Sequence, residues 1–108
     1  MKAVRFHAAK DIRVEDVPGP TKKLGPNDVL IKPLVTGICG TDLHEYIAGP
    51  IVTPQTPHVY TGATNPQILG HEFSAVVADK GSAATHVKVG DRVSIQPLIS
   101  PRDDYYGR

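Results

Sequence analysis

Two short stretches, GICGTDLH at residues 37–44 and GHE at residues 70–72, contain three side chains that commonly bind metal ions. The first stretch carries Cys39, and the second carries His71 and Glu72. A thiolate, an imidazole and a carboxylate suit zinc, and a catalytic zinc site keeps one of its four positions open for water or substrate. The two stretches therefore predict one part of a catalytic zinc site.

Each of these residues also has an ordinary structural interpretation. A lone cysteine is most often a small buried hydrophobic residue, and a lone histidine or glutamate is most often hydrogen-bonded or solvated. The combination favours a site, because Asp42 and His44 accompany Cys39 and the Gly-His-Glu triplet opens an apolar run. Gly40 allows a sharp turn after the thiol, and Gly70 allows a close backbone approach before the imidazole. We therefore expect both segments at turns, where the ligands can converge.

Five blocks of the sequence, taken in order, resemble the N-terminal, GroES-like part of the zinc-dependent medium-chain alcohol dehydrogenases: residues 1–5, 27–32, 37–44, 70–73 and 87–93. The resemblance covers nearly the whole chain. Residues 49–70 most resemble the butanediol and polyol dehydrogenase branch, which acts on vicinal diols and acetoin. The resemblance implies a mainly β fold with short helices, a GroES-like partial β-barrel that is α+β at the margin.

The resemblance also implies how a catalytic zinc ion is held. Cys39 and His71 resemble the two zinc ligands of the N-terminal part. Glu72 resembles the acidic neighbour that, in the polyol and diol branch, either binds zinc directly or swings in to displace water. Asp42 resembles the carboxylate that orients the zinc-bound histidine, and such partners raise the basicity of the ligand.

Two further residues resemble a proton relay. Thr41 resembles the hydroxyl that takes the proton of the substrate alcohol, and His44 resembles the imidazole that passes it to solvent. Thr41 and Asp42 also have a structural interpretation, because each can accept a backbone N–H at the start of a helix over residues 43–48. Capping and catalysis are compatible, so both interpretations stay open.

Composition limits the class of protein. A chain of 108 residues is one domain at most, and it buries about two-thirds of its unfolded surface. With 40% hydrophobic residues and a net charge of +1, it has an ordinary globular composition, and nothing indicates nucleic acid or membrane as a partner. Residues 1–7 lack the features of a secretory signal, and a single cysteine fits a reducing compartment. Cytoplasm is the expected location.

Short β-rich runs, separated by ten glycines and ten prolines, predict strands at residues 4–6, 12–17, 29–35, 73–78 and 92–95. One short helix is expected over residues 41–47. Residues 50–66 are rich in Pro and Thr, and loops of this length are usually functional or disordered. This loop lies between the ligand segments, so we expect it to border the substrate pocket.

The sequence departs from the family pattern at its end. The family commonly has four closely spaced cysteines that bind a structural zinc, whereas residues 100–108 contain no thiol, so no structural zinc is expected. The nucleotide-binding half, with its Gly-x-Gly-x-x-Gly turn, is absent from residues 1–108. NAD or NADP is therefore expected only through a missing domain, and no residue here is assigned to the cofactor. A fragment, a truncated product and an incomplete gene model all remain open.

Two functions follow. In the first, the chain belongs to a zinc-dependent, NAD(P)-linked oxidoreductase of alcohols or vicinal diols and supplies its zinc ligands and proton relay. In the second, it is a non-catalytic GroES-like module that binds a metal or a partner chain. A chaperonin-type lid would need none of the site residues. We expect the isolated chain to be inactive, marginally stable, and prone to form homo-oligomers or to associate through uncovered strands near residues 73–78 or 92–95.

Overall fold

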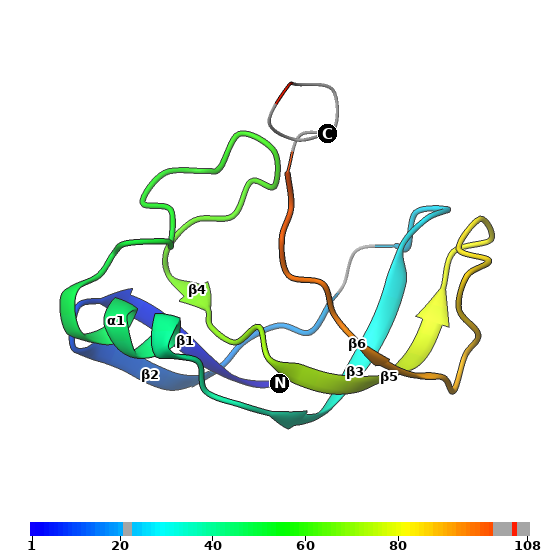
Figure 1. Ribbon diagram of the computed structural model, residues 1–108, viewed down its shortest axis with the longest axis horizontal. Helices are drawn as coiled ribbons and strands as arrows, with labels where there is room; N and C mark the ends of the chain where they lie inside the picture. The colour runs from blue at the N-terminus through cyan, green and yellow to red at the C-terminus, as the bar shows by residue number, and fades with distance from the viewer. Residues whose placement is uncertain (21–22, 101–104, 106–108) are drawn as a thin grey trace.

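Two small antiparallel sheets carry the part of the chain that the computed structural model describes, which is residues 1–20, 23–100 and 105. The sheets have the strand orders β2-β1-β4 and β3-β5-β6 (Figure 1). The prediction of a mainly β fold is confirmed, and within the described ranges the sheets do not close into a barrel. The elements are β1 (Lys2–Ala8), β2 (Asp11–Asp16), β3 (Val29–Thr36), α1 (Gly40–Ala48), β4 (Gln67–Ile68), β5 (Phe73–Lys80) and β6 (Arg92–Ser94).

The first sheet begins as a hairpin of β1 and β2, with β4 on the other edge of β1. Ala3 and Phe6 of β1 are buried. β4 pairs with β1 so that Gln67 lies opposite Phe6 and Ile68 opposite Arg5. This pairing holds the chain in place just before the Gly-His-Glu triplet.

The second sheet brings the two ligand segments to the same place. Its register sets Thr36, the last residue of β3, opposite Phe73, the first residue of β5. One step further, the N–H of Gly37 donates to the carbonyl oxygen of Glu72 over 2.7 Å. The chain after β3 and the chain before β5 therefore run side by side, so residues distant in sequence meet at this end of the sheet.

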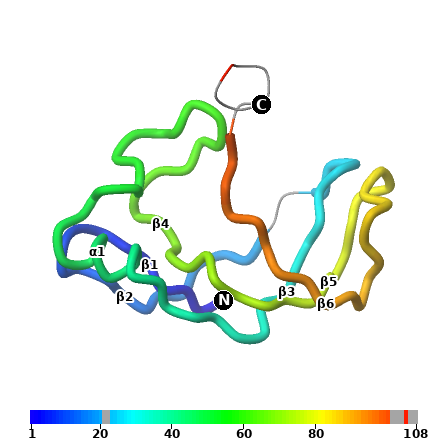
Figure 2. The backbone as a smooth tube through the Cα atoms, in the orientation of Figure 1, coloured from blue at the N-terminus to red at the C-terminus, as the bar shows by residue number. Residues whose placement is uncertain are grey.

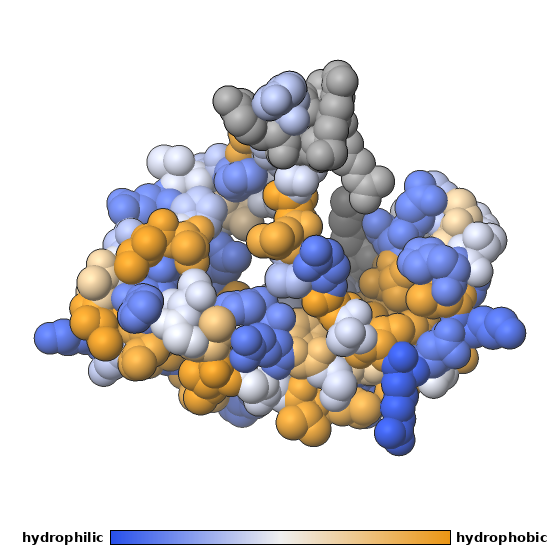
Figure 3. Space-filling view, in the orientation of Figure 1, coloured by the Kyte–Doolittle hydropathy of each residue, from blue (hydrophilic) through white to orange (hydrophobic). Residues whose placement is uncertain are grey.

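Little of the chain is fully buried. Among the described residues, the buried hydrophobic ones are Ala3, Phe6, Ala75, Val77 and Ala84, and the solvent-accessible surface is 8218 Å². A folded monomer of this mass typically exposes about 5,800 Å². Apolar side chains are widespread on the face shown in Figure 3, and Ile38 is 87% exposed. The protein therefore exposes more surface than a typical folded monomer of its mass, and part of that surface is apolar.

The predicted elements agree with the observed ones to within a few residues, except for β4. That strand has only two residues, too few to show a periodic pattern. Residues 49–66 contain no helix or strand and form the expected loop, seen as a green tube rising above β4 in Figure 2.

Strand order corrects one expectation about free edges. Uncovered strands were expected near residues 73–78 or 92–95, but β5 lies between β3 and β6, and β6 pairs with Ser74, Ala75 and Val76 of β5. β6 does lie at an edge of its sheet.

Across the described ranges, no helix has the length and apolar character needed to cross a membrane.

Candidate metal centre

The side chains of Cys39, His71 and Glu72, the three expected zinc ligands, lie close together in the structure. One ligand atom from each residue lies within 4.8 Å of those of the other two. Ligands bound at about 2.0–2.3 Å in a tetrahedral zinc site lie roughly 3.3–3.8 Å apart, so small side-chain rotations would close the set. Cys39 and His71 are half-buried and Glu72 is exposed. In chemistry and in spacing, this donor set fits one zinc ion.

Cys39 is held by the start of α1. It is the N-cap residue, with extended backbone at φ −90° and ψ 154°, and its N–H donates to Oδ2 of Asp42 over 3.1 Å. The capping interpretation of Asp42 is therefore confirmed. The expectation that Gly40 makes a sharp turn is wrong, because Gly40 is the first residue of the helix and a Cβ there would meet nothing within 4 Å.

His71 and Glu72 are placed by a turn in the backbone and by the neighbouring strand. Gly70 has φ +114°, a conformation that side-chain-bearing residues rarely adopt. A Cβ at this position would make only an ordinary contact of 3.5 Å, to Cγ2 of Thr36. Glycine is therefore required here for its backbone angle and not for a close approach, which corrects the expected reason.

The surroundings of Cys39 favour the thiolate. Sγ of Cys39 lies 3.5 Å from Oγ1 of Thr41. Hydrogen bonding from the side chain and then the backbone of Thr41, and next from His71, lowers the pKa of Cys39, while burial and the charge of Glu72 oppose the change. A thiolate is the form that binds a metal, so the helix start prepares Cys39 as a ligand.

The imidazole of His71 is held between Cys39 and Asp42. Its pKa is raised, first by the hydrogen bond with Cys39, against the effect of burial, and further by the charges of Asp42, Cys39 and Glu72. Nδ1 of His71 lies 3.7 Å from Oδ1 of Asp42. Asp42 thus faces a ring nitrogen of His71, and a carboxylate in such a position can fix the orientation of a metal-binding histidine ring.

The two proposed relay residues have different positions. Thr41 lines a cavity of about 520 Å³ together with His71. His44 is exposed on α1 and is not among the residues that line this cavity. Among the described residues, the side chain of His44 forms no hydrogen bond. The relay through His44 therefore stays a prediction.

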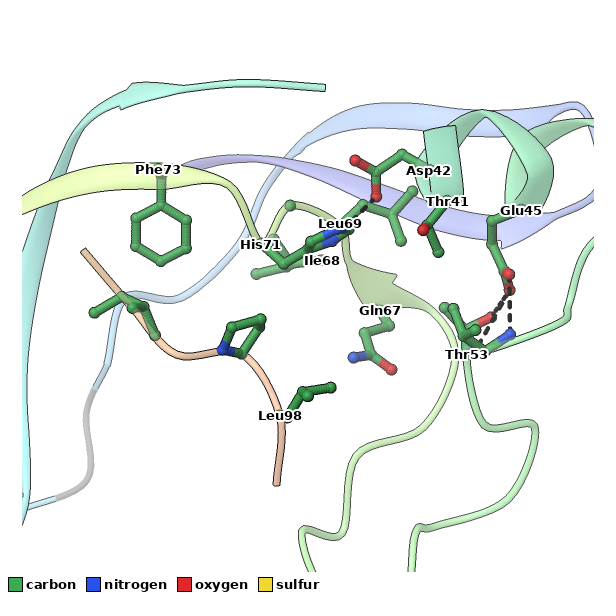
Figure 4. A pocket seen from close by; sticks show the side chains of 14 residues that line it. Thr41, Asp42, Glu45, Thr53, Gln67, Ile68, Leu69, His71, Phe73 and Leu98 are labelled. Atoms are coloured by element: carbon green, nitrogen blue, oxygen red, sulfur yellow. Dashed lines mark hydrogen bonds and ion pairs between the residues drawn. The ribbon is translucent and has the colours of Figure 1, made fainter. Parts of the chain in front are cut away.

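The cavity is bordered by α1, the long loop, β4 and the stretch after β6 (Figure 4). Val52 and Thr53 contribute the part from the loop, so the loop borders the cavity that contains His71. The remaining lining residues are Thr41, Asp42, Glu45, Gln67, Ile68, Leu69, Gly70, Phe73, Ile95, Pro97 and Leu98.

Glu45 is a cavity residue that sequence reasoning missed. It is 1% exposed and accepts hydrogen bonds from the N–H groups of Ile51 at 2.9 Å, Val52 at 3.0 Å and Thr53 at 3.2 Å. The hydroxyl of Thr53 donates to it as well. Burial raises the pKa of Glu45, but the bonds from Thr53, Val52 and Ile51 outweigh it, so the net pKa is lowered. A glutamate in a short helix gives no sequence signal of such burial.

The family model for the alcohol dehydrogenase GroES-like domain matches residues 25–106. The chain belongs to this family. The (R,R)-butanediol dehydrogenase of Bacillus subtilis (strain 168) is 48% identical to this chain over 101 residues, which are 93% of this chain and 29% of that protein. The chain thus spans less than a third of the curated relative. Residues 100–108, whose lack of thiols is the reason why no structural zinc is expected, lie mostly outside the described residues.

Solved structures of dehydrogenases also match this chain over part of their own length. The crystal structure of 2R,3R-butanediol dehydrogenase from Bacillus subtilis matches with a TM-score of 0.76 and 49% identity, covering 84% of this chain and 26% of that one. A Sinorhizobium meliloti 1021 protein assigned to the zinc-binding dehydrogenases, solved with NADP bound, matches with a TM-score of 0.72 and 35% identity over 98% of this chain and 27% of that chain.

Proposed function

We propose that this GroES-like domain supplies the zinc-binding part of the active site of an NAD(P)-linked oxidoreductase acting on alcohols or vicinal diols. The observation that carries the proposal is the convergence of Cys39, His71 and Glu72, with His71 also lining the cavity. The similarity to butanediol dehydrogenases supports the substrate class. The lone free thiol of Cys39 fits a reducing compartment such as the cytoplasm.

Each side chain of the site has a task in this proposal. Zinc, when bound, supplies a Lewis acid for the substrate oxygen. Cys39, His71 and Glu72 hold the ion, and Asp42 keeps the ring of His71 in its orientation. Thr41 lies at the cavity wall, where its hydroxyl takes the proton of the substrate alcohol and passes it toward His44 and solvent.

The hydride acceptor has to be bound by other polypeptide. The sequence has no Gly-x-Gly-x-x-Gly turn, and hydride transfer requires the nicotinamide to be held against the substrate carbon. Residues 1–108 alone are therefore expected to show no diol oxidation with NAD or NADP. Turnover by the purified chain would contradict the proposal.

Zinc binding by variants tests the ligand assignment. Cys39→Ser should lower zinc content more than Glu72→Gln, because thiolate is the strongest donor of the set. His71→Gln should also lose zinc, whereas His86→Gln, at an exposed histidine outside the group, should keep it. Equal zinc content in Cys39→Ser and the parent chain would refute the assignment.

A chimaera distinguishes the enzyme from a non-catalytic module. The chain would replace the matching N-terminal part of the Bacillus subtilis butanediol dehydrogenase. We expect the chimaera to oxidise butane-2,3-diol and to lose most of this activity with Thr41→Val. A chimaera that folds and binds zinc but shows no turnover would favour the non-catalytic module.

A further inference from the structure

Gln67 lies in the cavity wall next to the candidate metal centre. It belongs to β4 and pairs with Phe6 of β1, and its side chain lines the same cavity as Thr41 and His71. In Figure 4 its carboxamide extends into the space between Thr53 and Leu98. The pairing of β4 with β1 fixes the position of the Gln67 backbone.

The carboxamide of Gln67 has no hydrogen-bonding partner among the described residues. Its Oε1 is buried and accepts no bond, and no donor bond from its Nε2 is formed either. A polar group removed from water without a partner is costly. A ligand in the cavity is therefore the natural source of the missing bond.

The other polar side chains of the cavity are already engaged. Glu45 and Thr53 bond to each other. Asp42 accepts a hydrogen bond from the N–H of Cys39, and the hydroxyl of Thr41 contacts the thiol of Cys39. His71 is one of the three candidate metal ligands. The rest of the wall is mainly apolar, with the side chains Ile68, Leu69, Phe73, Ile95, Pro97 and Leu98. In such pockets a few free polar groups fix the orientation of the ligand.

We propose that Gln67 is a specificity-determining residue that hydrogen-bonds the second oxygen of a diol or hydroxyketone, the oxygen that does not sit at the metal centre. This inference rests on the proposed function. A carboxamide offers both a donor and an acceptor, and a hydroxyl pairs with either. A monofunctional alcohol has no second oxygen, so it would leave Gln67 without a partner and should bind more weakly than the diol.

Nuclear magnetic resonance of the zinc-loaded, ¹⁵N-labelled chain tests this assignment with butane-2,3-diol and butan-2-ol as probes. The diol should shift the side-chain NH₂ signals of Gln67 together with the amides of Thr41 and His71. Butan-2-ol should shift Thr41 and His71 but leave the Gln67 side chain nearly unchanged. If the diol shifted the signals of Thr41 and His71 but not those of Gln67, the role of Gln67 would be overturned and the proposed function would stand.

Variants add an independent measurement. Gln67→Met should weaken diol binding by roughly three- to tenfold, the loss of one hydrogen bond, without changing binding of butan-2-ol or zinc. Gln55→Met, at an exposed glutamine of the long loop, serves as the control and should not change the binding of the diol, of butan-2-ol or of zinc. If Gln67→Met weakened the binding of the diol and of butan-2-ol equally, the specificity role would be overturned. Failure of the parent chain to bind zinc, or to bind either probe, would instead overturn the proposed function.

Discussion

Oδ1 of Asp42 lies 3.7 Å from Nδ1 of His71, while Oδ2 of the same carboxylate accepts the N–H of Cys39 over 3.1 Å. One side chain thus contacts both ligand segments, the start of α1 and the chain before β5. The carboxylate caps the helix and faces the imidazole at the same time. Asp42 therefore couples the local fold to the geometry of the metal centre.

The first prediction concerns this coupling. Asp42→Asn keeps an oxygen for the Cys39 N–H but removes the negative charge next to His71. We expect zinc affinity to fall by roughly 10- to 100-fold, as for other carboxylates behind metal-bound histidines, with little change in the circular dichroism spectrum. Competition with a chromophoric chelator measures the affinity. An unchanged affinity would show that Asp42 serves only the helix.

The second prediction concerns the thiol. Hydrogen bonding from Thr41 is the largest cause that lowers the pKa of Cys39, so Thr41→Val should raise that pKa. In the zinc-free chain, alkylation of Cys39 by iodoacetamide should become slower at neutral pH, because less thiolate is present. The rates of parent and variant should converge at high pH, where both thiols are ionised. A variant whose pH–rate profile superimposes on that of the parent would refute the role of Thr41.

The third prediction concerns the buried carboxylate of Glu45. Glu45→Ala leaves the N–H groups of Ile51, Val52 and Thr53 without their acceptor. Thr53 is buried, and an unpaired buried donor costs about 1–3 kcal/mol, so the unfolding midpoint in urea should fall clearly. Glu15→Ala is a control, because that carboxylate bonds side chains on the first sheet. Equal losses of stability in the two variants would contradict a special role of Glu45.

The fourth prediction follows from the lowered pKa of Glu45. Its ordinary pKa is 4.5, and its folded pKa lies below this value. The stability that its ionised form contributes is therefore fully present above about pH 4.5 and is lost as pH falls through the folded pKa. Urea unfolding of Glu45→Gln should depend less on pH in this acidic range than unfolding of the parent. Parallel pH profiles for the two proteins would contradict the assignment.

The exposed apolar surface predicts the solution behaviour of the chain. Val4, Ile12, Ile38, Leu43 and Leu69 line a second cavity of about 360 Å³ between α1 and the first sheet. Such patches bind dyes and promote association, so the chain should bind an anilinonaphthalene dye in native buffer and sediment partly as oligomers. Ile38→Ser should reduce dye binding. A monodisperse monomer with a sharp thermal transition and no dye binding would show a self-sufficient module.

The sequence allowed the helix and every strand except β4 to be predicted, and it pointed to Cys39, His71 and Glu72 as neighbours, because glycine-flanked motifs and β-rich runs are local signals. The assignment of these three residues as zinc ligands stays a prediction. The roles of Glu45 and Gln67 were not predictable in this way. The burial of Glu45 depends on how residues 51–53 fold back onto α1, and the exposure of Gln67 to the cavity depends on pairing between β4 and β1. The expected turn at Gly40 was wrong because the extended backbone of Cys39 leads directly into the helix.

The most direct test of the metal centre is X-ray absorption at the zinc K-edge of the chain loaded with one equivalent of zinc. We predict one sulfur neighbour at about 2.3 Å, together with nitrogen and oxygen neighbours at about 2.0–2.2 Å. In Cys39→Ser the sulfur contribution should disappear. A spectrum of the parent chain without a sulfur neighbour would contradict the assignment of Cys39, and with it the zinc site on which the proposed function depends.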